Sequence, residues 1–315
     1  MQRRDLLRLA ALSPLLAAAG RLPAADAPAP TDLMPAFWRA YDAGRAAEDR
    51  VQAIAQAFFA PNAELYAGAG LKPTPERLAS WLPQFDAIAE SARRLSAGFA
   101  GHYRRHVEHF QREFPDFRRE RAPIYLMPSL FNFDGHLRPW QGKLPLFVGI
   151  DGIVRYHGDD ANLSVFLDHE SFHLYHGQLV PELLMDEQPP VYGSLWIEGL
   201  ATYVSERLNP DASRVQVLLD DRKLAAVDDA GVRDLAGKLL AVLDSTTPED
   251  ANRFFGAGHK GPEPARGGYL VGLHVARRLG QSRSLAELAR TPLAQLRGLI
   301  QQQLQGLAQG AADAA

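Results

Sequence analysis

Apolar residues recur every three or four positions along the first third of the chain, which is the spacing of one face of an α-helix. One such stripe runs through Val51, Ile54, Phe58 and Phe59. Apolar residues continue at the same helical spacing after this stripe, up to about residue 115. We therefore predict that residues 28–120, after a short Pro-rich linker, form an N-terminal helical region.

The pattern changes after residue 121. Residues 122–127 and 144–150 are short apolar runs that contain β-branched and aromatic side chains, which is typical of strands. Asn132-Phe133-Asp134-Gly135 lies between them and is a turn signal. We expect these runs to form a small sheet, but the pattern does not identify its edge strand.

Helical spacing returns after the sheet. Asp159-Asp160-Ala161-Asn162 is typical of a helix start, with acidic groups at the positive end of the helix dipole, and predicts a helix at residues 163–180. A second helix is expected at residues 193–208. Further helices are expected at roughly 213–223, 230–243, 248–256, 266–280 and 292–306.

The order of these elements predicts an α+β fold that is mainly helical. Residues 121–308 are expected to form one domain, in which a small sheet is followed by an active-site helix and a helical C-terminal lobe. We expect residues 309–315 to be a disordered tail.

Composition narrows the class of protein and of site. The chain has 315 residues, a formal net charge of −3 and no cysteine. The lack of a basic excess argues against a nucleic-acid partner. Without thiolates, a metal ion would have to be held by histidine and carboxylate side chains.

The first residues have the features of a targeting segment. Gln2-Arg3-Arg4-Asp5-Leu6 resembles the twin-arginine export signature, and the apolar run from Leu9 to Ala19 is too short for a comfortable membrane span. We expect residues 1–27 to be an export signal, so that the mature chain has no membrane span and is periplasmic or secreted. The alternative is an uncleaved amphipathic helix.

His169-Glu170-Ser171-Phe172-His173 reads H-E-x-x-H. Residues four apart lie on one helix face, so His169 and His173 can present two imidazoles to one metal ion. Glu170 is placed to take a proton from an attacking water rather than to bind the metal. Glu198 follows His173 by 25 residues on the second predicted helix. That distance leaves room for the helix to return antiparallel and supply a third ligand.

H-E-x-x-H followed by E-G-x-A-x-Y resembles the gluzincin class of zinc metallopeptidases. It is most similar to the aminopeptidase-N-like enzymes and to exported bacterial proteins described as predicted zinc-dependent proteases. The resemblance covers roughly residues 120–280 and implies a zincin-like fold. It also implies one Zn²⁺ per chain held by His169, His173 and Glu198, with Glu170 as the general base. In zincins the edge strand of the small sheet pairs with a peptide substrate.

Gly267-Gly268-Tyr269 resembles a helix start in the aminopeptidase-N-like enzymes, where a tyrosine hydroxyl donates to the oxyanion. Tyr269 is therefore our candidate donor. The alternative is an aromatic ring that only packs against the active-site helix. His259 and Arg266, in the loop before it, are weaker candidates.

The partner that orients the metal-binding histidines is not identified. Thermolysin-like relatives place an aspartate four residues after the ligand glutamate, where this chain has Thr202. Asp168 or a backbone carbonyl could take this role instead.

Two other histidine groups fit no metal motif. His102, His106 and His109 share one helix face, but arginines surround them, so we interpret this stripe as a solvated basic face. His176 lies about 10 Å along the helix from His169, too far to share one tetrahedral ion. We expect His176 to be a cleft wall or a satisfied polar residue.

Together these patterns predict an exported zinc-dependent peptidase that hydrolyses peptide bonds with a metal-activated water. Its partner would be a peptide or protein substrate. One alternative is a non-catalytic zincin-like envelope or assembly protein with a structural zinc. Another is a metal-free helical binding protein. Whether a peptidase would be an aminopeptidase or an endopeptidase stays open.

Overall fold

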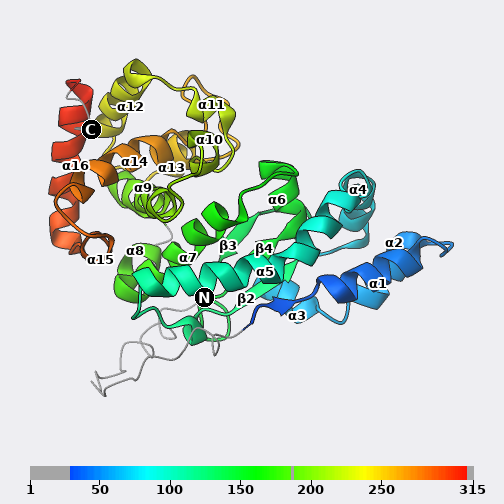
Figure 1. Ribbon diagram of the computed structural model, residues 1–315. Coiled ribbons are helices and arrows are strands. Elements are labelled where there is room, and N and C mark those ends of the chain that lie inside the picture. The colour runs from blue at the N-terminus through cyan, green and yellow to red at the C-terminus, as the bar shows by residue number, and fades with distance from the viewer. Residues whose placement is uncertain (1–28, 186–187, 311–315) are drawn as a thin grey trace, which may run out of the picture.

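The computed structural model describes residues 29–185 and 188–310. It is mainly helical with one small mixed sheet, which confirms the predicted α+β class. The chain passes from an N-terminal group of helices through the sheet to a C-terminal group of helices (Figure 1).

Helices fill the region before the sheet, as the apolar spacing predicts. They are α1 (Met34–Gly44), α2 (Arg50–Ile54), the π-helix η3 (Ala55–Phe59), α3 (Ala63–Gly68), α4 (Pro75–Asp86) and α5 (Ala89–Glu113). The side chains of Asp49 and Thr74 accept backbone N–H bonds at the starts of α2 and α4. These bonds satisfy donors that the first turn of a helix leaves free. Phe37 packs edge-to-face against Phe85 and so joins α1 to α4.

The sheet follows the short 3₁₀ turn η4 (Arg119–Arg121) and has the strand order β1-β2-β4-β3. Its strands are β1 (Thr31–Asp32), β2 (Ile124–Met127), β3 (Gly135–Leu137) and β4 (Leu146–Gly149). β1, β2 and β4 are parallel, whereas β3 is antiparallel to β4. The two predicted strands are therefore parallel neighbours, and the predicted turn between them leads into β3. Neither β1 nor the edge strand β3 follows from the sequence pattern.

The C-terminal helices begin directly after β4. They are α6 (Ile150–His157), α7 (Leu163–Leu179), α8 (Pro181–Met185), α9 (Val191–Leu208), α10 (Arg214–Val217), α11 (Arg222–Ala225), α12 (Asp229–Ala241), α13 (Pro248–Phe255), α14 (Gly267–Gly280), α15 (Leu285–Ala289) and α16 (Leu293–Ala308). The segment predicted as one helix at 213–223 is two short helices, because Leu219 and Asp220 take left-handed backbone angles between them. α6 and α15 are not predicted by the apolar pattern.

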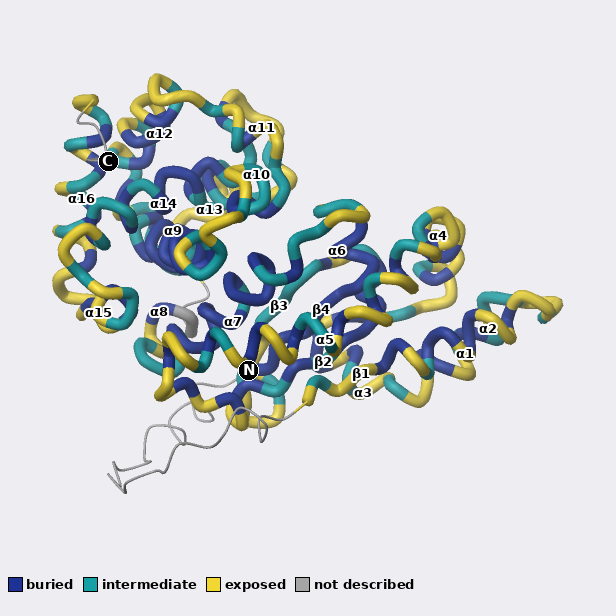
Figure 2. The backbone as a smooth tube through the Cα atoms, viewed as in Figure 1, coloured by how far each residue is buried: buried dark blue, intermediate teal, exposed yellow. Residues whose placement is uncertain are grey.

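Helix α9 lies at the centre of this region and packs against both α7 and α14. Its contact with α14 is so close that a Cβ on Gly199 would lie 2.3 Å from the Cα of Gly272. Only glycine permits two helix backbones to approach this closely. α7 and α9 are buried along most of their length (Figure 2), so polar side chains on their facing sides lie inside the protein.

None of the helices in residues 29–185 and 188–310 is long and apolar enough to cross a membrane. The predicted export signal, residues 1–27, lies outside the described part of the chain. Residues 311–315 of the predicted tail lie outside it as well.

Candidate metal centre

Helix α7 carries the first two candidate ligands. The side chain of Asn162 accepts N–H bonds from Ser164 and Val165 and starts the helix where the sequence predicts. One turn apart on the same face, the Nε2 atoms of His169 and His173 lie 3.1 Å from each other. Both imidazoles are buried.

Helix α9 brings Glu198 to the same point. Its Oε2 atom lies 3.4 Å from the Nε2 atom of His169 and 3.4 Å from that of His173. This carboxylate oxygen is buried and has no hydrogen-bond partner in the described part of the chain. A buried acceptor without a donor is costly unless a cation satisfies it.

The three separations fit a metal ion. Four ligands at 2.0–2.1 Å around one tetrahedral ion lie about 3.4 Å from each other. His169, His173 and Glu198 meet this spacing on three edges, so this buried group could hold a metal ion. The packing of α7 against α9 therefore brings together residues that the sequence pairs only by motif.

Charge interactions within the group keep the carboxylate of Glu198 ionised. Burial opposes ionisation of Glu198, but His173 and His169 outweigh it and hold its pKa far below the ordinary value. Burial lowers the pKa of His169, whereas Glu198 and Glu170 raise that of His173 against the effect of burial. The three side chains thus offer two imidazoles and an ionised carboxylate at one point.

Glu170 lies beside the group without joining it. Burial raises the pKa of its carboxyl to about 8, and the nearby Asp134 and Glu198 add to the rise while His173 opposes it. The side chain rests against β3, where a Cβ on Gly135 would lie 2.5 Å from the Cδ of Glu170. Glycine at this position therefore leaves room for the carboxyl group.

These residues form the wall of a cavity of about 640 Å³. All three strand residues of β3 line it, together with residues from α7, α9 and α14. Its lining includes Gly135, His136, Leu137, His169, Glu170, His173, Glu198, Arg266 and Tyr269. The candidate ligands therefore face a space that a small molecule or a peptide segment can enter.

Tyr269 lies in the first turn of α14 and lines this cavity. Its ring stacks on that of His169 with the centroids 6.0 Å apart and the planes 9° from parallel. Burial and the neighbouring Glu198 carboxylate raise the pKa of its hydroxyl well above the ordinary value. Tyr269 thus packs against α7 and also keeps its proton at the cavity wall.

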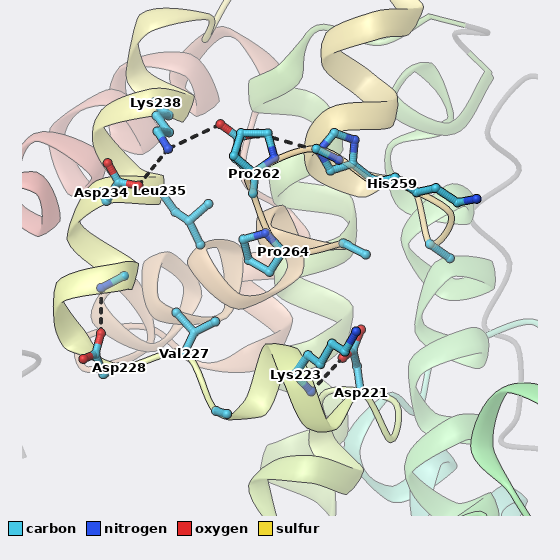
Figure 3. Close-up of a pocket in the computed structure, with 17 residues that line it drawn as sticks. Asp221, Lys223, Val227, Asp228, Asp234, Leu235, Lys238, His259, Pro262 and Pro264 are labelled. Atoms are coloured by element: carbon cyan, nitrogen blue, oxygen red, sulfur yellow. Dashed lines mark hydrogen bonds and ion pairs between the residues drawn. The ribbon is translucent and has the colours of Figure 1, made fainter.

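The two weaker candidates for the oxyanion donor line different cavities. Arg266 lines the same cavity as Tyr269. His259 instead lines a neighbouring cavity of about 940 Å³, where its Nε2 accepts a bond from the backbone N–H of Gly261 and lies 3.7 Å from Glu263 (Figure 3). The structure therefore places His259 outside the candidate metal centre.

The interpretation of the histidine stripe on α5 as a solvated face is wrong for two of its members. The Nδ1 of His106 and the Nε2 of His109 lie 2.8 and 2.9 Å from the carboxylate of Asp168. The side-chain amide of Asn209 donates to the same carboxylate at 2.7 Å. His106 is buried and also accepts the hydroxyl of Ser171, at 2.8 Å. No local pattern reveals these contacts, because they join residues about 40 to 65 positions apart.

The expected orienting partners of the ligands are wrong as well. Asp168 contacts the α5 histidines, and the hydroxyl of Thr202 donates to the backbone carbonyl of Glu198 at 2.7 Å. The buried Nδ1 atoms of His169 and His173 have no hydrogen-bond partner among the described residues. No polar side chain of the described residues therefore orients the two rings through Nδ1.

His176 is neither a cleft wall nor a satisfied polar residue. It is buried away from the cavity, and neither of its ring nitrogens has a hydrogen-bond partner within the described chain. Burial lowers its pKa to about 3, with a smaller effect of His173. It therefore packs as a neutral ring against Phe172.

Fold and site together define an α+β protein, mainly helical, with a buried group of two histidines and one glutamate that could hold a metal ion. Comparisons with protein-family models, with curated proteins and with solved structures each find no match to the chain. What the site can do is therefore inferred from its own geometry.

Proposed function

We propose that this protein is an exported zinc-dependent peptidase of the gluzincin type with a zincin-like fold. The observation that carries the proposal is the meeting of the ligand atoms of His169, His173 and Glu198 at 3.1–3.4 Å, with Glu170 beside them on a cavity wall. Two imidazoles and a carboxylate, with one position left open, form a ligand set typical of catalytic zinc. When bound there, zinc would polarise the scissile carbonyl and acidify the attacking water.

Glu170 is suited to exchange protons near neutral pH. Its pKa of about 8 lies near the working range of a general acid–base, and a cation beside it would lower this value and favour the carboxylate. As a base it would take a proton from the attacking water. As an acid it would then pass that proton to the leaving amine.

The edge strand β3 supports a peptide as the substrate. Within the described residues it pairs with β4 on one side only, and its residues Gly135 to Leu137 line the cavity beside Glu170. An extended peptide can add to such an edge through backbone hydrogen bonds, which gives affinity that does not depend on its sequence. A peptide bound in this way would pass directly over the proposed metal centre.

Tyr269 is suited to stabilise the oxyanion. Its raised pKa keeps the hydroxyl protonated, so it remains a donor over the working pH range. Its ring is held against His169, so the donor would be fixed in place before the reaction begins.

The test is cleavage of a peptide library by the zinc-loaded full chain and by its Glu170→Gln variant. Glutamine keeps the size of the side chain but cannot act as a base. We expect the variant to bind zinc as the original chain does and to lose turnover by about 10²- to 10⁴-fold.

Three results would decide against the proposal. Undiminished turnover in the variant would reject Glu170 as the base. Zinc binding without any cleavage by the original chain would favour a structural role for the metal. A chain that neither binds zinc nor cleaves peptides would favour a metal-free binding protein.

A further inference from the structure

We propose that Arg266 forms a subsite for a carboxylate of the substrate inside the cavity of the metal centre. This inference rests on the proposed peptidase function, because it names a chemical feature of the peptide that the same cavity would select. It assigns Arg266 to substrate binding rather than to the reaction itself.

Arg266 brings a positive charge to the wall of the cavity that holds the candidate metal ligands. It immediately precedes α14, three residues before Tyr269, and lines the same cavity as His169 and Glu198. It is close enough to Tyr269 for its charge to act on that hydroxyl. Among the described residues of this cavity wall, Arg266 is the single arginine or lysine.

The guanidinium of Arg266 is poorly paired for its depth. Its side chain is only 16% exposed, and its nearest carboxylate oxygen, on Asp221, is 3.7 Å from Nη2. Its buried Nε has no hydrogen-bond partner within the described residues. By contrast Arg297, which is 46% exposed, makes two hydrogen bonds to the carboxylate of Asp244 at 2.5 and 2.6 Å.

This contrast indicates that Arg266 has hydrogen-bond donors to offer a ligand. A guanidinium has five N–H donors, and burying them without acceptors is costly. Arg297 at the surface meets a paired carboxylate, whereas the more deeply placed Arg266 faces a cavity. A ligand that brings an acceptor into the cavity would satisfy donors that the protein leaves open.

The backbone at Arg266 adds a second observation. Its φ of 57° and ψ of 25° lie in the left-handed region, which a residue with a long side chain rarely adopts. Asparagine or glycine would take this conformation at lower cost. Strained backbone of this kind gathers at ligand-binding sites, where the side chain it positions is used.

The geometry of a guanidinium favours a carboxylate as the ligand, because its planar fork can donate two parallel bonds to one carboxylate. In a peptide this group comes from one of two sources. It is either the C-terminal carboxylate or the side chain of an aspartate or glutamate. Both sources share the chemistry that Arg266 recognises.

The test compares matched peptides in the zinc-loaded full chain. One pair differs only in a C-terminal carboxylate or amide, and further pairs exchange Asp for Asn or Glu for Gln at single positions. We expect kcat/KM to be roughly 10- to 100-fold higher for the acidic member of one pair, the range for a charged hydrogen bond. The pair that shows the preference identifies the source of the carboxylate.

The Arg266→Asn variant should abolish this preference, mainly through KM, so that kcat/KM for the acidic member falls to that of its neutral partner. Asparagine tolerates the left-handed backbone, so the variant tests the charge and not the fold. Arg266→Lys should restore part of the preference. Arg222→Asn, at an exposed position on α11, is the matched control and should keep it.

Peptide binding to the zinc-loaded Glu170→Gln protein, measured by calorimetry, gives a readout that needs no turnover. The acidic member should bind more tightly there, and adding Arg266→Asn should remove the difference. Binding with this preference but no cleavage by the original chain would reject the peptidase and keep the subsite. Cleavage or binding without the preference, or an equal loss for both members in Arg266→Asn, would overturn the subsite.

Discussion

Two clusters of histidine and carboxylate lie on helix α7 and look alike in composition. One joins His169 and His173 to Glu198, and the other joins Asp168 to His106 and His109. They differ in the hydrogen-bond donors that their carboxylates receive. In the second cluster the carboxylate accepts bonds from both histidines and from Asn209, whereas in the first the Oε2 of Glu198 has no donor among the described residues.

This difference distinguishes a structural hydrogen-bond network, around Asp168, from a candidate metal site, around Glu198. In the Asp168 cluster hydrogen bonds already do what a metal would do, and they join α5, α7 and the end of α9. In the Glu198 cluster the ligand atoms are spaced for an ion and face a cavity. Residue type alone would have ranked the two equally.

The largest effect on stability should come from the structural cluster. Asp168→Ala removes the acceptor of two histidines and an amide that are largely buried. We expect it to lower the free energy of unfolding by about 2–4 kcal/mol, with and without zinc. Urea unfolding of both forms measures this.

If Asp168→Ala lowered the free energy of unfolding only in the zinc-loaded form, Asp168 would act through the metal. The two clusters would then not differ in role. Glu182→Ala, which replaces an exposed carboxylate after α7, is a control that should change the unfolding free energy by less than about 0.5 kcal/mol.

His157, which belongs to neither cluster, shows how carboxylate partners change the pKa of a histidine. His157, at the end of α6, lies between Asp134 at 2.8 Å and Asp220 at 3.1 Å. Burial opposes its protonation, but the two carboxylates outweigh it and raise its pKa to about 9. Its stabilisation should therefore be fully present below the ordinary value near 6.5 and be lost as the pH rises through 9.

We expect His157→Gln to lower the free energy of unfolding by about 2 kcal/mol at pH 6 and by much less above pH 9.5. Denaturant unfolding at the two pH values measures the difference. His102→Gln is the control of opposite sign, because burial and Arg105 lower the pKa of His102, so this variant should lose no stability at pH 6. A constant loss at both pH values would show that His157 is neutral in the folded protein.

A smaller effect, on turnover, should follow from a substitution in the edge strand β3. Gly135→Ala would place a methyl group 2.5 Å from the Cδ of Glu170 and push the carboxyl from its position. We expect about a tenfold loss of turnover, or about 1.4 kcal/mol, with the zinc content unchanged. Gly237→Ala, in α12, meets no atom within 4 Å and should leave turnover unchanged. Equal turnover in both variants would mean that Glu170 does not need this space.

The parts that could be predicted from the sequence depend on local spacing. The i, i+4 pair His169 and His173 needs only a helix, and its start at Asn162 is visible in the residues that cap it. The mainly helical α+β class follows from apolar periods of the same short range.

The parts that could not be predicted depend on contacts between distant segments. β3 lies at an edge because β4 pairs with it on one side and with the more distant β2 on the other, and its three residues are too few to carry a pattern. The bond from His106 to Asp168 spans 62 positions. For this reason the arginines near His106 in sequence misled the interpretation of its face, while the acidic partner came from another helix.

The most direct test of the account is metal content, measured by elemental mass spectrometry on the full chain after zinc reconstitution. We predict about one zinc per chain, lost in His169→Ala/His173→Ala and retained in a folded His106→Gln/His109→Gln variant. No zinc in the original chain, or zinc that follows His106 and His109 instead, would contradict the assignment of the metal to the Glu198 cluster.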